Sequence, residues 1–299
     1  MTLLTLIEAC AQQLADAGVS FGHGTHNAHD EAAWLVLWQL GLPLDTPLMG
    51  DQAQADTAVN DEKQALVRAL VAERIRSRKP AAYLTHEAWL QGFAFYVDER
   101  AIVPRSLIAE LLVDGGMDYF LRPSTHKVLD LCTGNGSLAV IAANVFPDVV
   151  VTASDLCADA LAVGRINVDK HGLQGRITLV QSDGLRAAEL AAFGPFDLIV
   201  CNPPYVNAQS MATLPAEYRA EPALALDGNA SGGSDGMDFV RTLLKEVGAH
   251  LNPQGVLVLE IGNERPYFEA AFPSLEVIWL ETSAGEDQVL LLTRETLYP

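Results

Sequence analysis

Hydrophobic residues in the first part of the chain recur at helical spacing. Up to about residue 80, this pattern predicts helices over residues 1–14, 28–40 and 61–78. Asp30 is the expected cap of the second helix. The third ends in a basic cluster, which suits the negative end of a helix dipole. Residues 42–60, rich in Pro, Asp and Gln, are expected to form a loop.

The spacing of apolar residues changes after residue 88. Trp89, Phe93 and Phe95 belong to a pattern that predicts short strands in a β-hairpin over residues 88–104. Pro104-Arg105-Ser106 is then expected to open a helix that runs to residue 121. We therefore divide the chain into a helical N-terminal domain (residues 1–87), a β-hairpin linker (88–105) and a second domain (106–299).

From residue 127 onward, strands and helices alternate. Strands are expected over residues 127–132, 149–155, 177–182, 196–201, 255–261, 277–280 and 288–293. Helices are expected over residues 137–146, 158–171, 236–250 and 265–272. The alternation predicts an α/β fold, with a seven-stranded, Rossmann-like and largely parallel sheet. A short acidic turn joins the last two strands, which are therefore expected to be antiparallel.

Composition narrows the possible partners. The chain has 299 residues and a formal net charge of −19, which argues against a broad grip on nucleic acid phosphates. Direct sequence-specific nucleic acid binding is not expected, and a basic protein partner suits the charge better. Acidity that serves only solubility explains the charge equally well. No apolar run is long enough to cross a bilayer and no basic leader precedes the first helix, so a cytoplasmic location is expected.

Histidine and cysteine give weak metal signals. His23, His26 and His29 are regularly spaced, but no cysteine or acidic cluster completes a site, and no metal site is predicted. The cysteines form no CxxC pair and are expected to be buried free thiols: Cys10, Cys132, Cys157 and Cys201. Two of them end predicted strands that are expected to be neighbours, and a disulfide or metal there is the minor alternative.

The clearest cofactor signal lies in residues 128–136. A buried strand, Val-Leu-Asp-Leu, runs into the turn Cys-Thr-Gly-Asn-Gly and then into a helix. Glycine lets the backbone approach a ligand closely, and a helix N-terminus favours carboxylate or phosphate groups. The spacing Gly134-x-Gly136-x-x-Ala139 also fits a dinucleotide fingerprint, so an NAD-dependent dehydrogenase stays open.

Acidic residues at three strand ends extend this signal. Asp130 is placed to receive the amino group of methionine, which favours S-adenosylmethionine (SAM) over NAD. Asp155 can accept both ribose hydroxyls, and Asp183 is placed to meet the adenine amino group. Alternatively, Asp130 binds local backbone donors and Asp183 is a plain turn residue. The candidate cofactor contacts are Asp130, Cys132, Thr133, Gly134, Gly136, Asp155, Leu156, Asp183, Gly184 and Asn202.

The chemical signal is Asn202-Pro203-Pro204-Tyr205, which follows a buried strand at the edge where open α/β sheets bind ligands. Asn202 offers an amide donor and an acceptor that can orient a planar nitrogen. The prolines stiffen the loop and leave carbonyls free to accept N–H groups. Tyr205 offers a flat face for stacking. These four residues are the candidate catalytic residues of a methyltransferase acting on a planar amide or amine nitrogen.

Two further features stay open. Glu260 ends a strand and is either a site residue or a turn carboxylate. Residues 232–236, rich in glycine, form either a mobile flap near the site or an ordinary linker into a helix.

The motifs together resemble the HemK-type protein glutamine methyltransferases. The resemblance rests on residues 130–136, on Asn202-Pro203-Pro204-Tyr205 and on Glu221-Pro222-x-x-Ala225-Leu226-x-Gly228. It covers nearly the whole chain from about Gly22. It implies that the tetrapeptide holds a glutamine side chain, that Asp130, Gly134, Asp155 and Asp183 contact SAM, and that the N-terminal domain recognises the protein substrate.

Within this family, the chain is similar to the branch that modifies the large-subunit ribosomal protein numbered three. The similarity is carried by Gly22-His23-Gly24-Thr25-x-Asn27-Ala28, Ala88-Trp89-Leu90-x-Gly92 and Phe95-Tyr96-Val97-Asp98-Glu99-Arg100. The branch that modifies peptide-chain release factors usually reads Pro-Arg-Pro-Asp-Thr-Glu where this chain has Pro104-Arg105-Ser106. Two departures are Cys132 in place of a usual glycine and Leu107 in place of a usual proline.

Other functions remain as alternatives. The release-factor branch shares the core motifs, and an adenine methyltransferase acting on nucleic acid would use the same tetrapeptide. The latter predicts a basic patch, whereas the chain has only 19 Lys and Arg residues. A SAM-binding assembly factor without catalytic activity is the remaining alternative.

Overall fold

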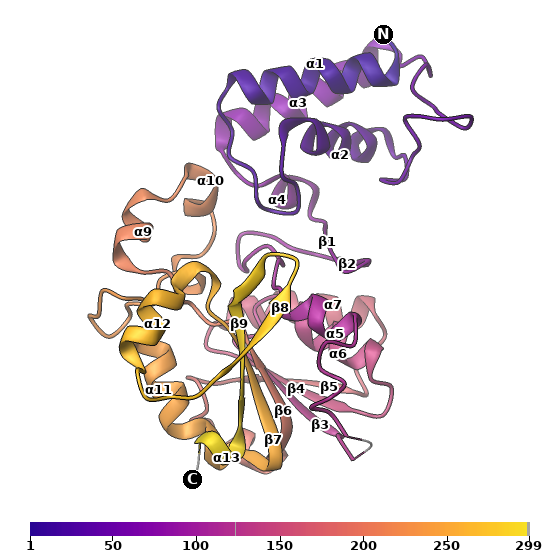
Figure 1. The fold of residues 1–299 in the computed structure, drawn as a ribbon. Coiled ribbons are helices and arrows are strands. Elements are labelled where there is room, and N and C mark those ends of the chain that lie inside the picture. Colours follow the sequence, from indigo (N-terminus) through magenta and orange to yellow (C-terminus); the bar gives the residue numbers. More distant parts are fainter. Residues whose placement is uncertain (123, 298–299) are drawn as a thin grey trace. The chain divides into compact units, whose positions relative to one another are not determined.

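The computed structural model describes residues 1–122 and 124–297, so residues 123 and 298–299 of the predicted second domain lie outside the described part. The chain forms two compact units (Figure 1). The first combines residues 1–88 with residues 215–221, and the second combines residues 89–214 with the chain from residue 222 onward. The excursion of residues 215–221 into the first unit has no counterpart in the sequence pattern.

The first unit is helical. It contains α1 (Leu3–Asp16), α2 (Ala28–Leu40), α3 (Asp61–Ser77), α4 (Ala81–Thr85) and α10 (Ala216–Arg219). The three predicted helices are confirmed to within two residues, and residues 42–60 contain no helix or strand. The predicted cap at Asp30 is wrong, because Asn27 is the cap and its side chain accepts the Asp30 N–H at 2.9 Å.

A buried ionic cluster ties residues 215–221 to these helices. The side chain of Arg74 is fully buried, with Nε 2.8 Å from the Glu31 carboxylate and Nη1 3.5 Å from Glu217. His23 Nε2 lies 3.2 Å from the buried carboxylate of Glu221. The basic end of α3 therefore does more than complement the helix dipole: Arg74 neutralises the buried Glu31, and Arg78, with Nη1 3.1 Å from Glu217, shares the neutralisation of that carboxylate.

The region after the first unit forms a hairpin and a short helix. Strands β1 (Ala88–Leu90) and β2 (Phe93–Phe95) form the predicted two-stranded sheet. Helix α5 (Ile108–Val113) is much shorter than the predicted helix over residues 107–121. The physical reason is the glycine pair that follows, since Gly115 has φ +74° and glycine disfavours a continued helix.

The second unit confirms the predicted seven-stranded α/β fold. Its strands are β3 (Lys127–Leu131), β4 (Val150–Asp155), β5 (Ile177–Gln181), β6 (Phe196–Cys201), β7 (Leu251–Glu260), β8 (Ile278–Thr282) and β9 (Gly285–Thr293). The sheet order is β5-β4-β3-β6-β7-β9-β8, and only β9 pairs antiparallel with its neighbours β7 and β8. The order reverses between β3 and β6, and such a switch point is where open α/β sheets bind ligands.

Helices cover both faces of this sheet (Figure 1). One face packs against α5, α6 (Ser137–Val145) and α7 (Ala158–Lys170). The other packs against α8 (Ala188–Phe193), α11 (Asp238–Glu246) and α12 (Arg265–Ala271). Along β3, Val128 faces the first layer while Leu129 and Leu131 face the second, as the period of two in a strand requires.

The remaining elements are short. They are α9 (Ala208–Thr213), η1 (Ala223–Ala225), η2 (Val247–His250), η3 (Gly262–Glu264) and α13 (Arg294–Leu297). Strand β7 begins four residues before the predicted one, because residues 252–255 form a bulge opposite β6 that reads as a turn in the sequence. Within the described part of the chain, we find no helix long and apolar enough to cross a membrane.

Candidate active site

The switch point brings the two sequence motifs together. Strands β3 and β6 pair in parallel, with Leu131 opposite Cys201. The next residues, Cys132 and Asn202, therefore leave the sheet side by side at its carboxyl edge. The glycine-rich turn and the Asn-Pro-Pro-Tyr tetrapeptide, far apart in sequence, thus begin at neighbouring points.

The turn after β3 has an unusual backbone. Cys132 and Gly136 both have positive φ, at +62° and +80°. Gly136 is also required by packing, because a Cβ there would lie 3.3 Å from the Cα of Gly164 in α7. Cys132 adopts a left-handed conformation that favours glycine, which is the residue that the resemblance expects at this position.

Asp130 lies beneath this turn and is fully buried. One carboxylate oxygen, Oδ2, accepts the Thr133 hydroxyl at 2.5 Å and the Ala139 N–H at 2.9 Å. Both donors are close to Asp130 in sequence, as expected if Asp130 serves only to bind local donors. The other oxygen, Oδ1, has no hydrogen-bond partner among the described residues. Burial raises the pKa of Asp130 to about 7, so the site favours a proton or a positive charge at this carboxylate.

Asp155 ends β4 at the same edge and is half-buried. Its Oδ2 accepts the Gly134 N–H at 2.9 Å, and its Oδ1 accepts the Cys157 N–H at 2.8 Å. These bonds fix the carboxylate against the glycine turn while leaving acceptor positions on both oxygens. The next side chain, Leu156, is 48% exposed and offers an apolar surface beside it.

Asp183, after β5, stands apart from this group. Its side chain is exposed and pairs with Arg186 at 2.7 Å, three residues further along the chain. This local ion pair is what the turn-residue interpretation expects. The neighbouring Gly184 lies against Phe239, since a Cβ there would be 3.8 Å from its ring.

The tetrapeptide begins directly after β6. Asn202 is half-buried and Pro203 is buried. Burial, together with the nearby Glu260 carboxylate, raises the pKa of Tyr205, so its phenol stays protonated and can donate a hydrogen bond. The tetrapeptide therefore presents a rigid set of carbonyl, amide and phenol groups at the switch point.

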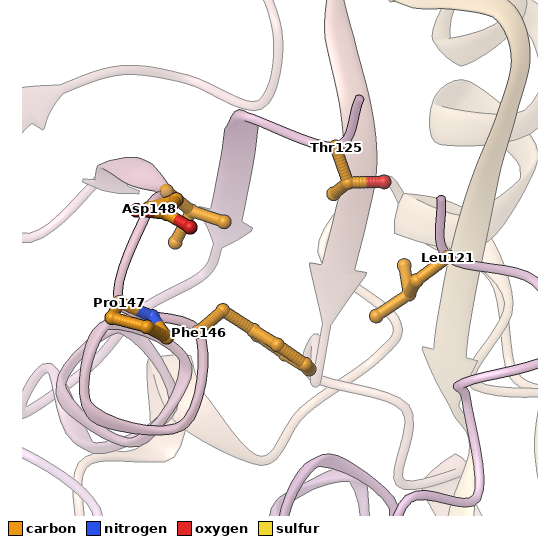
Figure 2. A pocket seen from close by; sticks show the side chains of 6 residues that line it. Leu121, Thr125, Phe146, Pro147 and Asp148 are labelled. Carbon is orange, nitrogen blue, oxygen red and sulfur yellow. The ribbon is translucent and has the colours of Figure 1, made fainter. Parts of the chain in front are cut away.

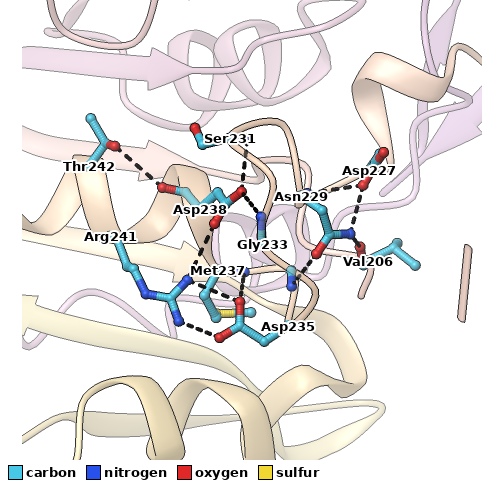
Figure 3. Close-up of polar contacts among 11 residues, drawn as sticks. Val206, Asp227, Asn229, Ser231, Gly233, Asp235, Met237, Asp238, Arg241 and Thr242 are labelled. Atoms are coloured by element: carbon cyan, nitrogen blue, oxygen red, sulfur yellow. Dashed lines mark hydrogen bonds and ion pairs between the residues drawn. The ribbon is translucent and has the colours of Figure 1, made fainter. Parts of the chain in front are cut away.

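A hydrogen-bonded loop, residues 227–238, packs against the end of the tetrapeptide and the residue that follows it. Asn229 Nδ2 donates to the Val206 carbonyl at 3.0 Å, and Asn229 Oδ1 accepts the Gly236 N–H at 2.8 Å (Figure 3). Gly236 packs directly on Tyr205: a Cβ there would overlap its carbonyl oxygen and lie 2.9 Å from its carbonyl carbon. The glycine-rich segment left open by the sequence is thus a support for the tetrapeptide.

The far end of the same loop is also fixed by side chains. The Asp238 carboxylate accepts the N–H groups of Ser231 and Gly233 at 2.8 and 3.0 Å (Figure 3). Arg241 forms an ion pair with Asp235. The loop is therefore held by its own polar contacts at both ends.

A second support was missed by sequence reasoning. The buried carboxylate of Glu264 accepts from the Asn207 side-chain amide, with both oxygens 2.8 Å from Nδ2. Asn207 in turn caps α9 through a 2.9 Å bond from the Ser210 N–H. The only sequence signal was the position of Asn207, two residues after the tetrapeptide.

A small hollow lies away from this site. It is lined by Leu121, Thr125, Phe146, Pro147, Asp148 and Val149 (Figure 2). These residues precede β3 and β4, so the hollow is at the amino edge of the sheet, opposite the tetrapeptide. It is mainly apolar and contains none of the predicted site residues.

The histidines and cysteines that gave weak metal signals in the sequence lie in different environments. His23 is buried beside Glu221, whereas His26 and His29 are exposed, so the three do not converge. No group of His, Cys, Asp or Glu in the described chain is arranged to hold a metal ion. The cysteines are free; Cys10 and Cys201 are buried as predicted, whereas Cys132 and Cys157 are only half-buried.

A Rossmann-like sheet with a glycine turn, an acidic strand end and Asn-Pro-Pro-Tyr at its switch point defines a methyltransferase. The family model "Methyltransferase small domain" matches residues 110–223. The ribosomal protein uL3 glutamine methyltransferase of Bordetella pertussis is 50% identical over 99% of this chain and 96% of its own length. Those of Burkholderia pseudomallei and Neisseria meningitidis serogroup B are 49% and 47% identical, over 97% and 99% of this chain and 94% of their own lengths. The chain belongs to this family of ribosomal protein uL3 glutamine methyltransferases.

A solved structure shares the fold. The catalytic domain of hMettl16, in complex with the MAT2A 3'UTR hairpin 1, matches with a TM-score of 0.52 and 12% identity, over 82% of this chain and 84% of that one. At this identity the likeness concerns the fold alone.

Proposed function

We propose that the protein transfers a methyl group from SAM to the side-chain amide nitrogen of a glutamine in ribosomal protein uL3. The observation that carries this proposal is the Asn202–Tyr205 tetrapeptide, which begins beside the glycine turn at the switch point. The names and near full-length identity of the relatives support the choice of substrate. The excess of negative charge, −19, suits a basic ribosomal protein.

The residues at the carboxyl edge fit SAM. We expect Asp155 to accept the ribose hydroxyls, because it is half-buried and keeps free acceptor positions. The exposed face of Leu156 suits the adenine ring. The unpartnered Oδ1 of Asp130 suits an ammonium group. When bound, SAM supplies an electrophilic methyl group on a positively charged sulfur.

The remaining predicted cofactor contacts have less support in the geometry and stay proposals. Cys132, Thr133, Gly134 and Gly136 form the turn that faces this edge. We expect the backbone of Gly184 to border the adenine. Asp183 would have to exchange its ion pair with Arg186 for the adenine amino group.

The chain's own groups then act on the glutamine amide. The nitrogen of a carboxamide is a weak nucleophile because its lone pair is conjugated with the carbonyl. The Asn202 side chain and the carbonyls that follow it accept the amide N–H groups, which returns electron density to the nitrogen. Fixed hydrogen-bond partners, and placement of the amide nitrogen in line with the methyl group, then account for most of the rate enhancement. The amide nitrogen loses its proton after the methyl transfer. We expect the ring of Tyr205 to stack on the glutamine amide and to orient its plane.

We further propose that the first unit recognises the protein substrate. Its sequence carries the Gly22–Ala28 signature that resembles the branch acting on the ribosomal protein. A cytoplasmic location follows from a ribosomal protein substrate and stays a prediction.

Methyl transfer from labelled SAM tests the proposal. Purified uL3, purified release factor and RNA are incubated separately with the protein, and any labelled protein is mapped by peptide sequencing. We expect label on one glutamine of uL3. Label on the release factor alone would assign the protein to the release-factor branch, and label on RNA would support an adenine methyltransferase.

The variant Asn202→Ala tests the tetrapeptide. We expect methyl transfer to fall at least about a hundredfold and SAM affinity to fall much less, since Asn202 is a predicted cofactor contact but its main lost contacts act on the glutamine. The matched control is Asn252→Ala, because Asn252 lies at the opposite edge of the sheet and bonds Asp197 at 2.8 Å. Unchanged transfer by Asn202→Ala would refute the proposed role. Thermal stabilisation by NAD but not by SAM would instead favour a dehydrogenase.

A further inference from the structure

A buried asparagine of α7 contacts both the glycine turn and the chain segment that follows β2. Asn167 is fully buried. Its Nδ2 donates to the Asn135 carbonyl, in the middle of the turn, at 2.8 Å and to the Tyr96 carbonyl at 2.9 Å. Its Oδ1 accepts the Tyr96 N–H at 2.7 Å. One side chain therefore joins two parts of the chain that are far apart in sequence, and both its amide nitrogen and its carbonyl oxygen are paired.

The carboxamide of Asn167 matches the groups that it meets. It provides two N–H donors and one carbonyl acceptor, as Tyr96 and Asn135 together require. Towards Tyr96 it accepts the N–H and donates to the C=O of the same residue, as the opposite residue of an antiparallel strand does. An aspartate would lack the donors, and an apolar residue would leave all three backbone groups without this partner. The contacts therefore depend on the residue type as well as on its size.

Helix α7 also packs closely on the turn through its backbone. Gly164 lies three residues before Asn167 and so on the same face of the helix. A Cβ at Gly136 would lie 3.3 Å from the Gly164 Cα, and a Cβ at Gly164 would lie 3.6 Å from the Gly134 carbonyl oxygen. The helix therefore holds the turn at two points, by close backbone contact at Gly164 and by a hydrogen bond at Asn167.

The segment of residues 96–102 borders the same turn. Ile102 lies against Gly134, because a Cβ at Gly134 would be 3.6 Å from the Ile102 Cγ2. Ala101 packs in a small apolar cluster with α7, and Tyr96 lies against this cluster. One helix thus holds both the turn and the segment beside it, and Asn167 is bonded to both.

We propose that Asn167 is a positioning residue for SAM: it fixes the glycine turn and residues 96–102 in the arrangement that receives the cofactor. This role rests on the proposed function, which assigns the turn to SAM. Asn167 acts on the cofactor only through the backbone of Asn135 and Tyr96. A turn that is already held in its binding arrangement loses less conformational entropy when the ligand binds, so the ligand binds more tightly.

Calorimetric binding of SAM to the full-length Asn167→Ala variant tests this role. We expect the Kd for SAM to rise about tenfold, which corresponds to about 1.4 kcal/mol of binding free energy. The reason is that the turn and residues 96–102 then have to be ordered by the ligand. A Kd within about twofold of the wild-type value would overturn the inference.

Val168→Ala is the matched control in the same helix. Val168 is fully buried, and its side chain packs in a core cluster that includes no described residue of the turn. The control should lower the melting temperature, because it removes buried methyl groups. We expect its Kd for SAM to change less than about twofold, since distant sites act independently. An equal rise of the Kd in the two variants would reduce Asn167 to a structural residue and overturn the positioning role.

Kinetics add a readout that a loss of stability does not give. In methyl transfer to uL3, Asn167→Ala should raise the KM for SAM about tenfold and leave the KM for uL3 within about twofold. An increase in the KM for uL3 alone would place the effect on the protein substrate and contradict a role for SAM.

Hydrogen exchange of the wild-type protein gives a test that does not depend on the folding of a variant. If the bonds of Asn167 strengthen SAM binding, SAM must strengthen those bonds by the same factor, because coupling is reciprocal. The reference is the His126 N–H, which is also bonded to a side-chain oxygen, that of Asp197, at 2.8 Å. SAM should slow exchange of the Tyr96 N–H more than that of this reference. Equal slowing at the two amides, or none, would overturn the inference.

The binding experiment separates this inference from the proposed function. If the wild type binds no SAM, the proposed function fails. If the wild type binds SAM and Asn167→Ala binds it equally tightly, only the role of Asn167 fails.

Discussion

Gly236→Ala tests whether the loop of residues 227–238 sets the position of the tetrapeptide. A Cβ at Gly236 would overlap the Tyr205 carbonyl oxygen and lie 2.9 Å from the carbonyl carbon, whereas ordinary contacts begin at 3.4 Å. The carbonyl carbon must therefore recede by at least 0.5 Å, since 3.4 minus 2.9 is 0.5. The oxygen must recede farther, on the order of 1 Å. A misplacement of about 1 Å in an active site can cost roughly a hundredfold in rate.

The substitution also strains the backbone, and this effect needs its own control. Gly236 has φ +78°, and a residue with a Cβ pays about 1–2 kcal/mol for a left-handed conformation. Gly232 lies in the same loop with φ +90°, and nothing lies within 4 Å of a Cβ built there. Gly232→Ala therefore reproduces the strain without the overlap. The difference between the two variants isolates the contact with Tyr205.

The assay compares the two variants in methyl transfer to uL3 and in urea unfolding. We expect both to lose about 1 kcal/mol or more of unfolding free energy. Only Gly236→Ala should also lose about a hundredfold in kcat, which corresponds to about 2.7 kcal/mol of transition-state stabilisation. Equal kcat values for the two variants would refute the reasoning, because the loop would then not determine where the tetrapeptide lies.

Substitutions at three other positions test the buried Asp130, the backbone at Cys132 and the buried ionic cluster. The pKa of Asp130 is raised to about 7, so the folded state holds the carboxyl proton more tightly than the unfolded chain does. The free energy of unfolding should therefore fall as pH rises from about 4 to 7. Asp130→Asn should flatten this part of a curve of unfolding free energy against pH. Cys132→Gly should retain its melting temperature, whereas Cys132→Val should lower it, because a β-branched residue is strained at φ +62°. Arg74→Met should lose about 3–5 kcal/mol in urea unfolding, because it leaves Glu31 buried without its cation, whereas Glu217 keeps its ion pair with Arg78; a loss below about 1 kcal/mol would contradict the described cluster.

The sequence predicted the sheet well because its signal is local. Each strand of the second unit is a short apolar run bounded by turn residues, and β6 was predicted over the residues it occupies, 196–201. The errors have two origins: a tertiary contact that overrules local preference, and a local glycine signal that apolar spacing does not show. The bulge at residues 252–255 reads as a turn, yet pairing with β6 keeps it in β7. The glycine pair at 115–116 ended a helix that apolar spacing alone would extend.

The strand-end positions of the candidate site residues were predictable from the sequence, but the contacts that support them were not. The tetrapeptide and Asp155 follow strands, so parallel topology places them at one edge. No such rule places Glu264 and Asn229, because their role depends on hydrogen bonds across 57 and 23 residues of sequence. Glu260 was recognised only as a strand-end carboxylate, since the sequence does not show that the Ser106 hydroxyl and the Leu107 N–H meet it.

The excursion of residues 215–221 into the first unit limits how the protein can be dissected. The chain crosses between the two units three times, after residues 88, 214 and 221. Cutting the chain after residue 88 would separate Glu217 and Glu221 from Arg74 and His23, leaving ionisable groups of both fragments without their counterparts. The two units are thus not independent modules joined by a linker, and neither fragment should be expected to express as a faithful copy of its part. Chimaeras that exchange substrate recognition between relatives would have to transplant residues 215–221 together with the N-terminal helices.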